Sequence, residues 1–232
     1  MDLQIFNANR ERVAYLENVI SVSYVLNLNS LWTASFSLPA SDTKNTYCQP
    51  LHYVEIYDGD ERIDLFRIIG EDLTRSNEVV RVYECEHVLA TLLNDVLFQY
   101  HQIGGTGVYT DDVLEYILDA QTTENWQLST CAFSRQFEYS FENENLLSAL
   151  FAVPKAFDTD FVWTWDTTVY PWKLSLNALP SNMASEIRYG KNLTEIKKYR
   201  DFTGLANRIY ALGYGEGVNQ LTIKSANSGL AY

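Results

Sequence analysis

Histidine and cysteine are the residues whose chemistry would most readily build a catalytic site in this chain. Cys85 and His87 form the closest pair, and positions 85 and 87 of a strand point to the same side. A cysteine nucleophile needs a base and a third group that orients this base, and the sequence indicates no such third residue. We therefore expect Cys85, His87, His52 and His101 to be packing or strand-end residues, with catalysis as the open alternative.

The spacing of these residues does not predict a metal site. Cys48, Cys85 and Cys131 have no CxxC spacing and are odd in number, which argues against both a zinc site and a disulfide framework. The turn at residues 58–61 offers too few oxygen ligands for a calcium loop and is typical of a hairpin. We expect buried free thiols, no metal and no cofactor.

Paired carboxylates and a glycine-rich turn are two further patterns that enzymes use. Glu142 with Glu144, and Asp158 with Asp160, are close enough in sequence to act as the acid and base of a glycosidase. Because the chain has 30 acidic residues, such pairs also arise by chance. We expect a helix entrance at the first pair and a solvated loop at the second. The glycine-rich turn at residues 104–107 lacks the Gly-Lys-Ser/Thr ending of a phosphate cradle, so we expect a linker there.

Aromatic residues concentrate in one predicted hairpin, which contains Trp163, Trp165, Tyr170 and Trp172. Such rings can pack in a core, bury a subunit interface or stack on sugars. We favour the core, because Trp163 and Trp165 share one strand face. The interface and the sugar site stay open as alternatives.

The charge of the chain limits its partners. There are 30 acidic and 17 basic residues among 232, so the net charge is −13. Binding to nucleic-acid phosphates needs clustered Lys and Arg, and the basic stretch at residues 191–200 is interrupted by Glu195. The first 13 residues do not resemble a signal peptide, and no segment has the roughly 18 apolar residues of a membrane span. We expect a soluble protein that neither inserts into a membrane nor binds DNA specifically.

The pattern of apolar residues predicts an α+β fold that is mainly β. Short alternating runs separated by polar turns predict a small N-terminal β-barrel in residues 1–94. Residues 95–185 contain helical patterns and a hairpin, which predict an α+β middle domain. Residues 186–232 return to strand-like runs and indicate the start of a second, incomplete barrel-like β domain.

Several elements are predicted in detail. A helix should begin at Thr110 as its cap, and a second helix should span residues 144–152 until Pro154 interrupts it. The chain should loosen through residues 100–107. Residues 193–199 and 206–212 should be extended.

The sequence resembles a known family in residues 187–213. Ile187-Arg-Tyr-Gly-Lys-Asn-Leu-Thr-Glu-Ile-Lys-Lys, followed by Leu205-Ala-Asn-Arg-Ile-Tyr-Ala-Leu-Gly, is similar to the minor structural, or tail-endopeptidase-like, proteins of siphophages and prophages of Gram-positive hosts. A helix ending near Trp126 and a helix at residues 142–150 also lie where this family has equivalents. Pro154 and Lys155 depart from the pattern, since the family has an uninterrupted helix there.

The resemblance implies a structural role in a virion. Proteins of this family resemble the hub of contractile tails, in which three copies form a pseudo-hexameric ring that closes or extends the tail tube at its tip. The implied partners are two further copies, the ring of the distal tail protein and the tape-measure protein, with DNA passing through unbound. The protein would be made in the host cytoplasm and would be no enzyme, because a peptidoglycan hydrolase would belong to a C-terminal extension. A cell-wall hydrolase or its positioning domain, and a host carbohydrate- or receptor-binding module, are the alternatives.

Overall fold

The computed structural model describes residues 1–75, 79–181, 185–225 and 227–230. Contacts along the chain divide it into two compact units, residues 1–181 and residues 182–232, and each is described by itself. The predicted α+β fold, mainly β, is confirmed: strands in three sheets form most of the regular structure.

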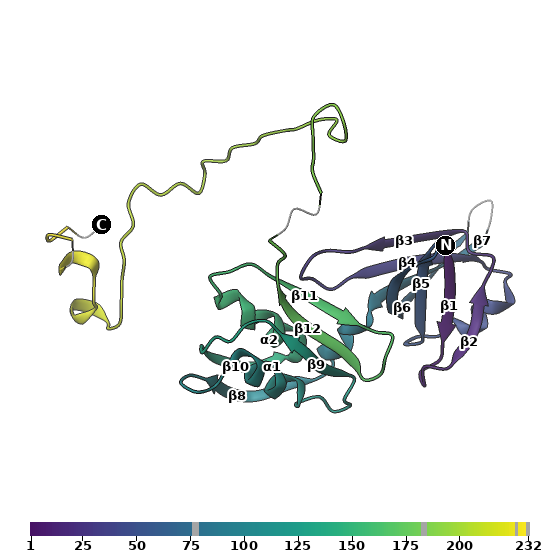
Figure 1. The fold of residues 1–232 in the computed structure, drawn as a ribbon, viewed down its shortest axis with the longest axis horizontal. Coiled ribbons are helices and arrows are strands. Elements are labelled where there is room, and N and C mark those ends of the chain that lie inside the picture. Colours follow the sequence, from purple (N-terminus) through teal and green to yellow (C-terminus); the bar gives the residue numbers. More distant parts are fainter. Residues whose placement is uncertain (76–78, 182–184, 226, 231–232) are drawn as a thin grey trace. The chain divides into compact units, whose positions relative to one another are not determined.

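The N-terminal part of the first unit is a seven-stranded antiparallel sheet (Figure 1). Its strand order is β2-β1-β5-β6-β7-β4-β3, and the hairpin predicted at residues 58–61 joins β5 to β6 with Gly59 at a φ of 62°. The strands are β1 (Asp2–Phe6), β2 (Arg12–Leu16), β3 (Ser21–Val25), β4 (Thr33–Pro39), β5 (Tyr53–Asp58), β6 (Glu61–Arg75) and β7 (Val79–His87).

The sheet curls around one apolar core without closing. Alternate residues of each strand point inward, as in Leu3 with Ile5 and Val54 with Ile56, all fully buried. In the described pairings β2 and β3 remain edge strands, so the closed barrel that we predicted is not formed by these hydrogen bonds. A 3-10 turn, η1 (Thr43–Tyr47), lies against β2, where Lys44 Nζ donates to the Tyr15 carbonyl at 2.5 Å.

The middle part contains a two-stranded ribbon, a three-stranded sheet and two short helices (Figure 1). In the sheet, β12 pairs antiparallel with β11 and parallel with β9. Helix α1 contacts both β8 of the ribbon and β9 of the sheet. The elements are β8 (Val96–Gly104), α1 (Thr110–Leu118), β9 (Trp126–Cys131), β10 (Glu138–Asn145), α2 (Leu146–Ala152), β11 (Phe161–Asp166) and β12 (Trp172–Ala178).

The helix starts differ from our predictions by one or two residues. The N-cap of α1 is Tyr109, whose N–H donates to Asp112 Oδ2 at 2.7 Å. The Thr110 hydroxyl instead accepts from the Arg135 N–H at 3.0 Å and so ties α1 to the chain before β10. Helix α2 begins at Leu146 rather than at residue 144, because the Asn145 side chain caps it by accepting from the Ser148 N–H at 2.9 Å.

Residues 96–104 form strand β8, so the prediction that the chain loosens through residues 100–107 was wrong for residues 100–104. The strand pairs with β10 in antiparallel register, His101 opposite Phe141. Gly104 ends it at a φ of 113°, and a Cβ there would lie 1.9 Å from the Phe137 carbonyl oxygen. Only glycine allows this approach of the two strands.

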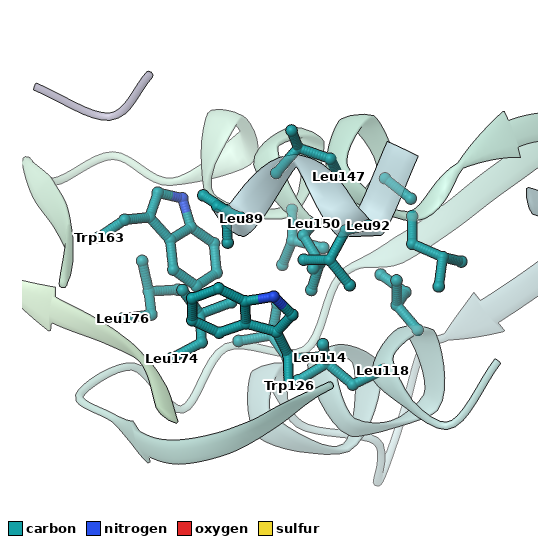
Figure 2. Packing of buried hydrophobic residues seen from close by; sticks show 14 of the residues in the cluster. Leu89, Leu92, Leu114, Leu118, Trp126, Leu147, Leu150, Trp163, Leu174 and Leu176 are labelled. Carbon is teal, nitrogen blue, oxygen red and sulfur yellow. The ribbon is translucent and has the colours of Figure 1, made fainter. Parts of the chain in front are cut away.

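The middle part has a core that also includes Leu65 of β6 from the seven-stranded sheet. Trp126 and Trp163 lie among leucines of both helices and of β12 (Figure 2). Directly after β7 the chain enters the same core as a 3-10 turn, η2 (Val88–Leu93), whose residues Leu89 and Leu92 are buried. The sheet and the middle part are therefore joined by continuous packing rather than by a linker.

The second unit is described from residue 185 onward and has a different character. Its regular structure is two isolated bridges, Tyr189 with Leu193 and Leu212 with Thr222, and two 3-10 turns, η4 (Gly217–Asn219) and η5 (Ile223–Ser225). The strands predicted at residues 193–199 and 206–212 do not form within the described residues. Their apolar side chains lack a neighbouring strand and are exposed: Ile196 by 78% and Ile209 by 71%.

None of the helices in the described ranges is both long and apolar enough to cross a membrane.

Candidate functional site

The strongest cluster of chemically capable side chains lies where the β11–β12 hairpin meets the seven-stranded sheet. Asp64 of β6 is at its centre, with a side chain only 8% exposed. Its Oδ1 accepts from the Leu65 N–H at 2.8 Å and from Arg62 Nη1 at 3.2 Å. From the hairpin, Trp165 Nε1 donates to Oδ2 at 2.9 Å and the Thr167 hydroxyl donates to Oδ1. A buried carboxylate is tolerated here because several donors replace its water shell.

Arg62 balances the charge of this cluster. Its Nε donates to Glu55 Oε1 at 2.5 Å, and its Nη2 donates to the Thr167 hydroxyl at 2.7 Å. Burial on its own lowers the pKa of Arg62, but the hydrogen bond to Glu55 and the charges of Asp64 and Glu55 outweigh burial and raise the pKa. The same guanidinium thus connects two strands of the sheet to the hairpin.

His87 completes the cluster and is fully buried. Its Nδ1 accepts from the Leu89 N–H at 3.1 Å, so the ring proton of the neutral form is on Nε2, which lies 3.4 Å from Asp64 Oδ2. Burial raises the pKa of the Asp64 carboxyl, but the contact with His87 and the hydrogen bonds from Thr167 and Leu65 outweigh burial and lower the pKa. The ring of His87 also lies against Trp165 and Trp32, at centroid distances of 4.9 and 5.6 Å.

A histidine beside a buried aspartate is the arrangement that orients a catalytic base. Here both nitrogens of His87 are directed to Leu89 and Asp64, and neither is directed to Cys85, the partner that the sequence suggested. Cys85 lies in the core of the sheet, and burial raises the pKa of its thiol. A neutral, buried thiol is a poor nucleophile. The geometry holds two layers together, with the side chains of Asp64 and His87 buried between them.

A second polar contact joins the same two layers. Asn29, in the loop between β3 and β4, has a side chain that reaches the edge strand β11. Its Nδ2 donates to the Phe161 carbonyl at 3.0 Å, and its Oδ1 accepts from the Trp163 N–H at 2.8 Å. The amide therefore takes the place of a strand residue beside β11 and covers part of this edge.

The other candidates from the sequence are dispersed. His52 Nδ1 lies 2.8 Å from the Tyr47 carbonyl, and His101 Nδ1 lies 2.7 Å from the Tyr116 hydroxyl. Cys48 is buried, and burial raises its pKa to about 12. Within the described ranges no three His, Cys, Asp or Glu side chains are grouped so that they could hold a metal ion.

The acidic pairs and the glycine turn have structural contacts. Glu142 and Glu144 lie at the end of β10, directly before the Asn145 cap of α2, and Asp158 pairs with Arg135 at 2.9 Å in an exposed loop. In the turn at residues 104–107, the Gly105 N–H donates to the Phe137 carbonyl at 3.0 Å and the Gly107 N–H donates to the Gln136 side chain at 3.1 Å. These N–H groups are bound within the protein and do not form an open phosphate cradle.

The aromatic hairpin is divided between the core and a cleft. Trp163 and Trp172 are buried, so their rings are not available for stacking on a sugar. Tyr170 is 40% exposed and faces a cleft of about 410 Å³ between the hairpin turn and the outer side of β1 and β5. The sequence analysis did not identify this cleft, because the residues that line it are far apart along the chain.

Comparison with protein families identifies the middle part of the chain. Residues 95–171 match the model of the prophage endopeptidase tail domain. Residues 95–171, about a third of the chain, are thus similar to a prophage tail domain. The resemblance that we inferred from residues 187–213 is thus confirmed by a different segment. No curated protein matches the sequence.

Solved structures with a similar fold are also tail proteins. Prophage tail protein gp18 from Listeria monocytogenes EGD-e superposes with a TM-score of 0.58 at 13% identity, over 84% of this chain and 57% of that one. The tail protein from Neisseria meningitidis MC58 gives 0.52 at 9% identity, over 75% and 49% of the two chains. The 43 kDa tail protein of prophage MuSo2 from Shewanella oneidensis gives 0.52 at 8%, over 76% and 54%.

This chain spans about half the length of these tail proteins. The shared fold and the match of residues 95–171 both indicate similarity to tail proteins. The polar joint around Asp64 fixes residues 95–171 to the seven-stranded sheet through Trp165 and Thr167.

Proposed function

We propose that the protein is a component of the hub at the tip of a phage or prophage tail. The match of residues 95–171 to the prophage endopeptidase tail domain carries this proposal. In it, three copies form a pseudo-hexameric ring that closes or extends the tail tube, beside the ring of the distal tail protein and the tape-measure protein. The chain is made in the host cytoplasm and ends up in the virion.

The distribution of charge supports passage of DNA without binding. Residues 1–181 carry 26 acidic and 10 basic residues, whereas residues 182–232 carry 4 acidic and 7 basic residues. A negative first unit repels phosphates, so a ring that presents it to the channel lets DNA slide.

The apolar side chains of residues 187–223 support assembly. Ile187, Tyr189, Tyr199 and Tyr214 are each at least 72% exposed, and exposed apolar surface of this extent is typical of an interface. In the proposed hub, the neighbouring copies bury these side chains.

Tails purified from the phage or prophage test the proposal. We expect gold-labelled antibodies against residues 1–181 to bind at the tip of the tail, and chemical cross-linking to give a three-copy species. Labelling along the tail shaft or at the head would refute the hub.

The proposal also assigns no enzymatic activity to this chain. The burial of Asp64 and of His87, whose Nδ1 accepts from the Leu89 N–H, supports this view. Purified chain should therefore give no cleared band in a gel that contains cell wall. A clear band that disappears in the His87→Gln variant would favour the alternative function, a cell-wall hydrolase.

A further inference from the structure

The cleft between the hairpin turn and the seven-stranded sheet has the composition of a ligand site. Its volume is about 410 Å³, and it lies at a junction of two packed layers, where small-molecule sites are frequent. Phe6, Tyr53 and Tyr57 line one side and Tyr170 lines the other. Arg10 stands at the same cleft.

Most polar groups of the cleft are held by each other. Glu55 accepts from Arg62 Nε at 2.5 Å and from the Tyr57 hydroxyl at 3.0 Å. Arg62 is further bound to Asp64 and to Thr167. These bonds fix the wall before any ligand arrives, which lowers the entropic cost of binding.

Arg10 is the exception. Its guanidinium carbon lies 3.4 Å from the centroid of the Tyr170 ring. Among the described residues it forms no ion pair with a carboxylate. Its backbone is held in a left-handed turn, with a φ of 63° and its N–H donating to the Asn7 carbonyl at 2.9 Å. A guanidinium stacked on a ring keeps its in-plane donors free for an oxyanion.

The surroundings determine which anion fits. The first unit has 26 acidic and only 10 basic residues, so its overall field disfavours highly charged anions. Affinity must therefore come from contacts inside the cleft. The tyrosines offer flat apolar faces, and the Tyr57 hydroxyl, which donates to Glu55, can still accept a hydrogen bond. A sugar ring presents C–H faces and hydroxyl donors that match both.

We propose that this cleft binds a saccharide that carries a carboxylate, with Arg10 pairing with the carboxylate and Tyr57 contacting the sugar ring. The proposal concerns a small ligand and does not depend on the tail-hub function. It shares two residues with the aromatic hairpin that the sequence suggested as a sugar site, since Tyr170 and Trp172 line the cleft, whereas Trp163 lies in the core.

Isothermal titration of the full chain with methyl galacturonoside, a sugar with one carboxylate, tests the proposal. We expect saturable binding, with the neutral methyl galactoside binding about tenfold more weakly or worse, because the charge-assisted bonds to Arg10 are lost. Equal binding of the two sugars, or no binding of the galacturonate at millimolar concentration, would overturn it. Tighter binding of a glycerol phosphate oligomer, which has no sugar ring, would also overturn it.

Two arginines of the same turn region form a matched pair of variants. Arg10→Ala should weaken galacturonate binding about tenfold. Arg12→Ala should leave binding unchanged, because Arg12 contacts Gln4 and does not line the cleft. Thermal unfolding of both variants checks that each is folded. An equal loss in both would show that only general charge is involved and would refute the site.

Discussion

Residues 1–181 and residues 185–230 use aromatic and aliphatic side chains in opposite ways. In the first unit Trp126 and Trp172 are at most 1% exposed, inside a core that both helices and six strands share. In the second unit Tyr214 is 92% exposed and Tyr199 is 80% exposed. Apolar residues alone therefore do not make a core: the first unit also has strand neighbours and polar contacts that hold its layers together.

Protease sensitivity should show the largest contrast between the two units. Trypsin should cut first after Lys197, Lys198 and Arg200, which are exposed and lie in no strand or helix. Cleavage after Arg62 or Arg67 should be about a hundredfold slower or more, because it waits for opening of the folded unit. Mass spectrometry of the early fragments measures this.

A stable fragment that contains residues 1–181 is the expected product of that digestion. Simultaneous cleavage in both units would contradict the division. In assembled tails the same sites should become protected, and their continued cleavage would argue against burial of residues 187–223 in the hub.

Removing one aromatic side chain from each unit should give very different losses of stability. Trp126→Ala leaves a large cavity and breaks the bond from Nε1 to the Thr91 hydroxyl at 3.0 Å, so it should lower the free energy of unfolding by about 4 kcal/mol. Tyr214→Ala should change it by less than about 0.5 kcal/mol. Urea titrations of both variants test this, and similar losses would show that Tyr214 is packed in solution.

The joint around Asp64 should be the next most sensitive position. Asp64→Asn keeps the volume but places an NH₂ group where two or more donors point, so stability should fall by about 3 kcal/mol. Asp158→Asn is the control, since its only described ion pair is exposed and should contribute less than about 1 kcal/mol. Equal effects of the two variants would contradict a buried joint.

The same joint predicts a pH dependence of stability. The pKa of Asp64 is lower in the folded chain than in the unfolded chain. Its contribution is therefore fully present above the unfolded pKa of about 4 and is lost as the pH falls through the lower, folded value. Between pH 5 and pH 2, the free energy of unfolding should fall more in the wild-type chain than in Asp64→Asn, by an amount on the order of a few kcal/mol. Parallel pH profiles would refute this account.

The sequence predicted the local elements well where periodicity and turn chemistry agree. The alternation of Leu3 with Ile5, the Gly59 hairpin and the stop at Pro154 are local signals, and all three have the predicted structure. Strand β8 was missed because its outer residues Phe98 and Tyr100 are apolar but exposed, so no alternation marks it. The division at residues 94 and 185 stays a prediction.

The polar joint was out of reach of the sequence for a geometric reason. Asp64 and Thr167 are more than one hundred positions apart, and nothing local to either indicates the other. The pair of Cys85 and His87 was suggested by proximity in sequence, but the hydrogen bond from Leu89 turns the imidazole toward Asp64 instead. For the same reason the cleft beside Arg10 could not be assembled from a linear pattern.

The smallest predicted effect concerns the contact of Asn29 with β11. Asn29→Ala should lower the free energy of unfolding by about 1–2 kcal/mol, because two hydrogen bonds are lost and alanine is strained at a φ of 53°. Asn29→Gly loses the same hydrogen bonds but has no such strain, so it should lower the free energy of unfolding by only about 1 kcal/mol. This smaller loss measures the contribution of the hydrogen bonds alone. Asn27→Ala, two residues away in the same exposed loop, should be neutral within about 0.5 kcal/mol. Urea titration of the three variants measures these differences, and wild-type stability of Asn29→Gly would show that the amide only fills space beside the edge strand.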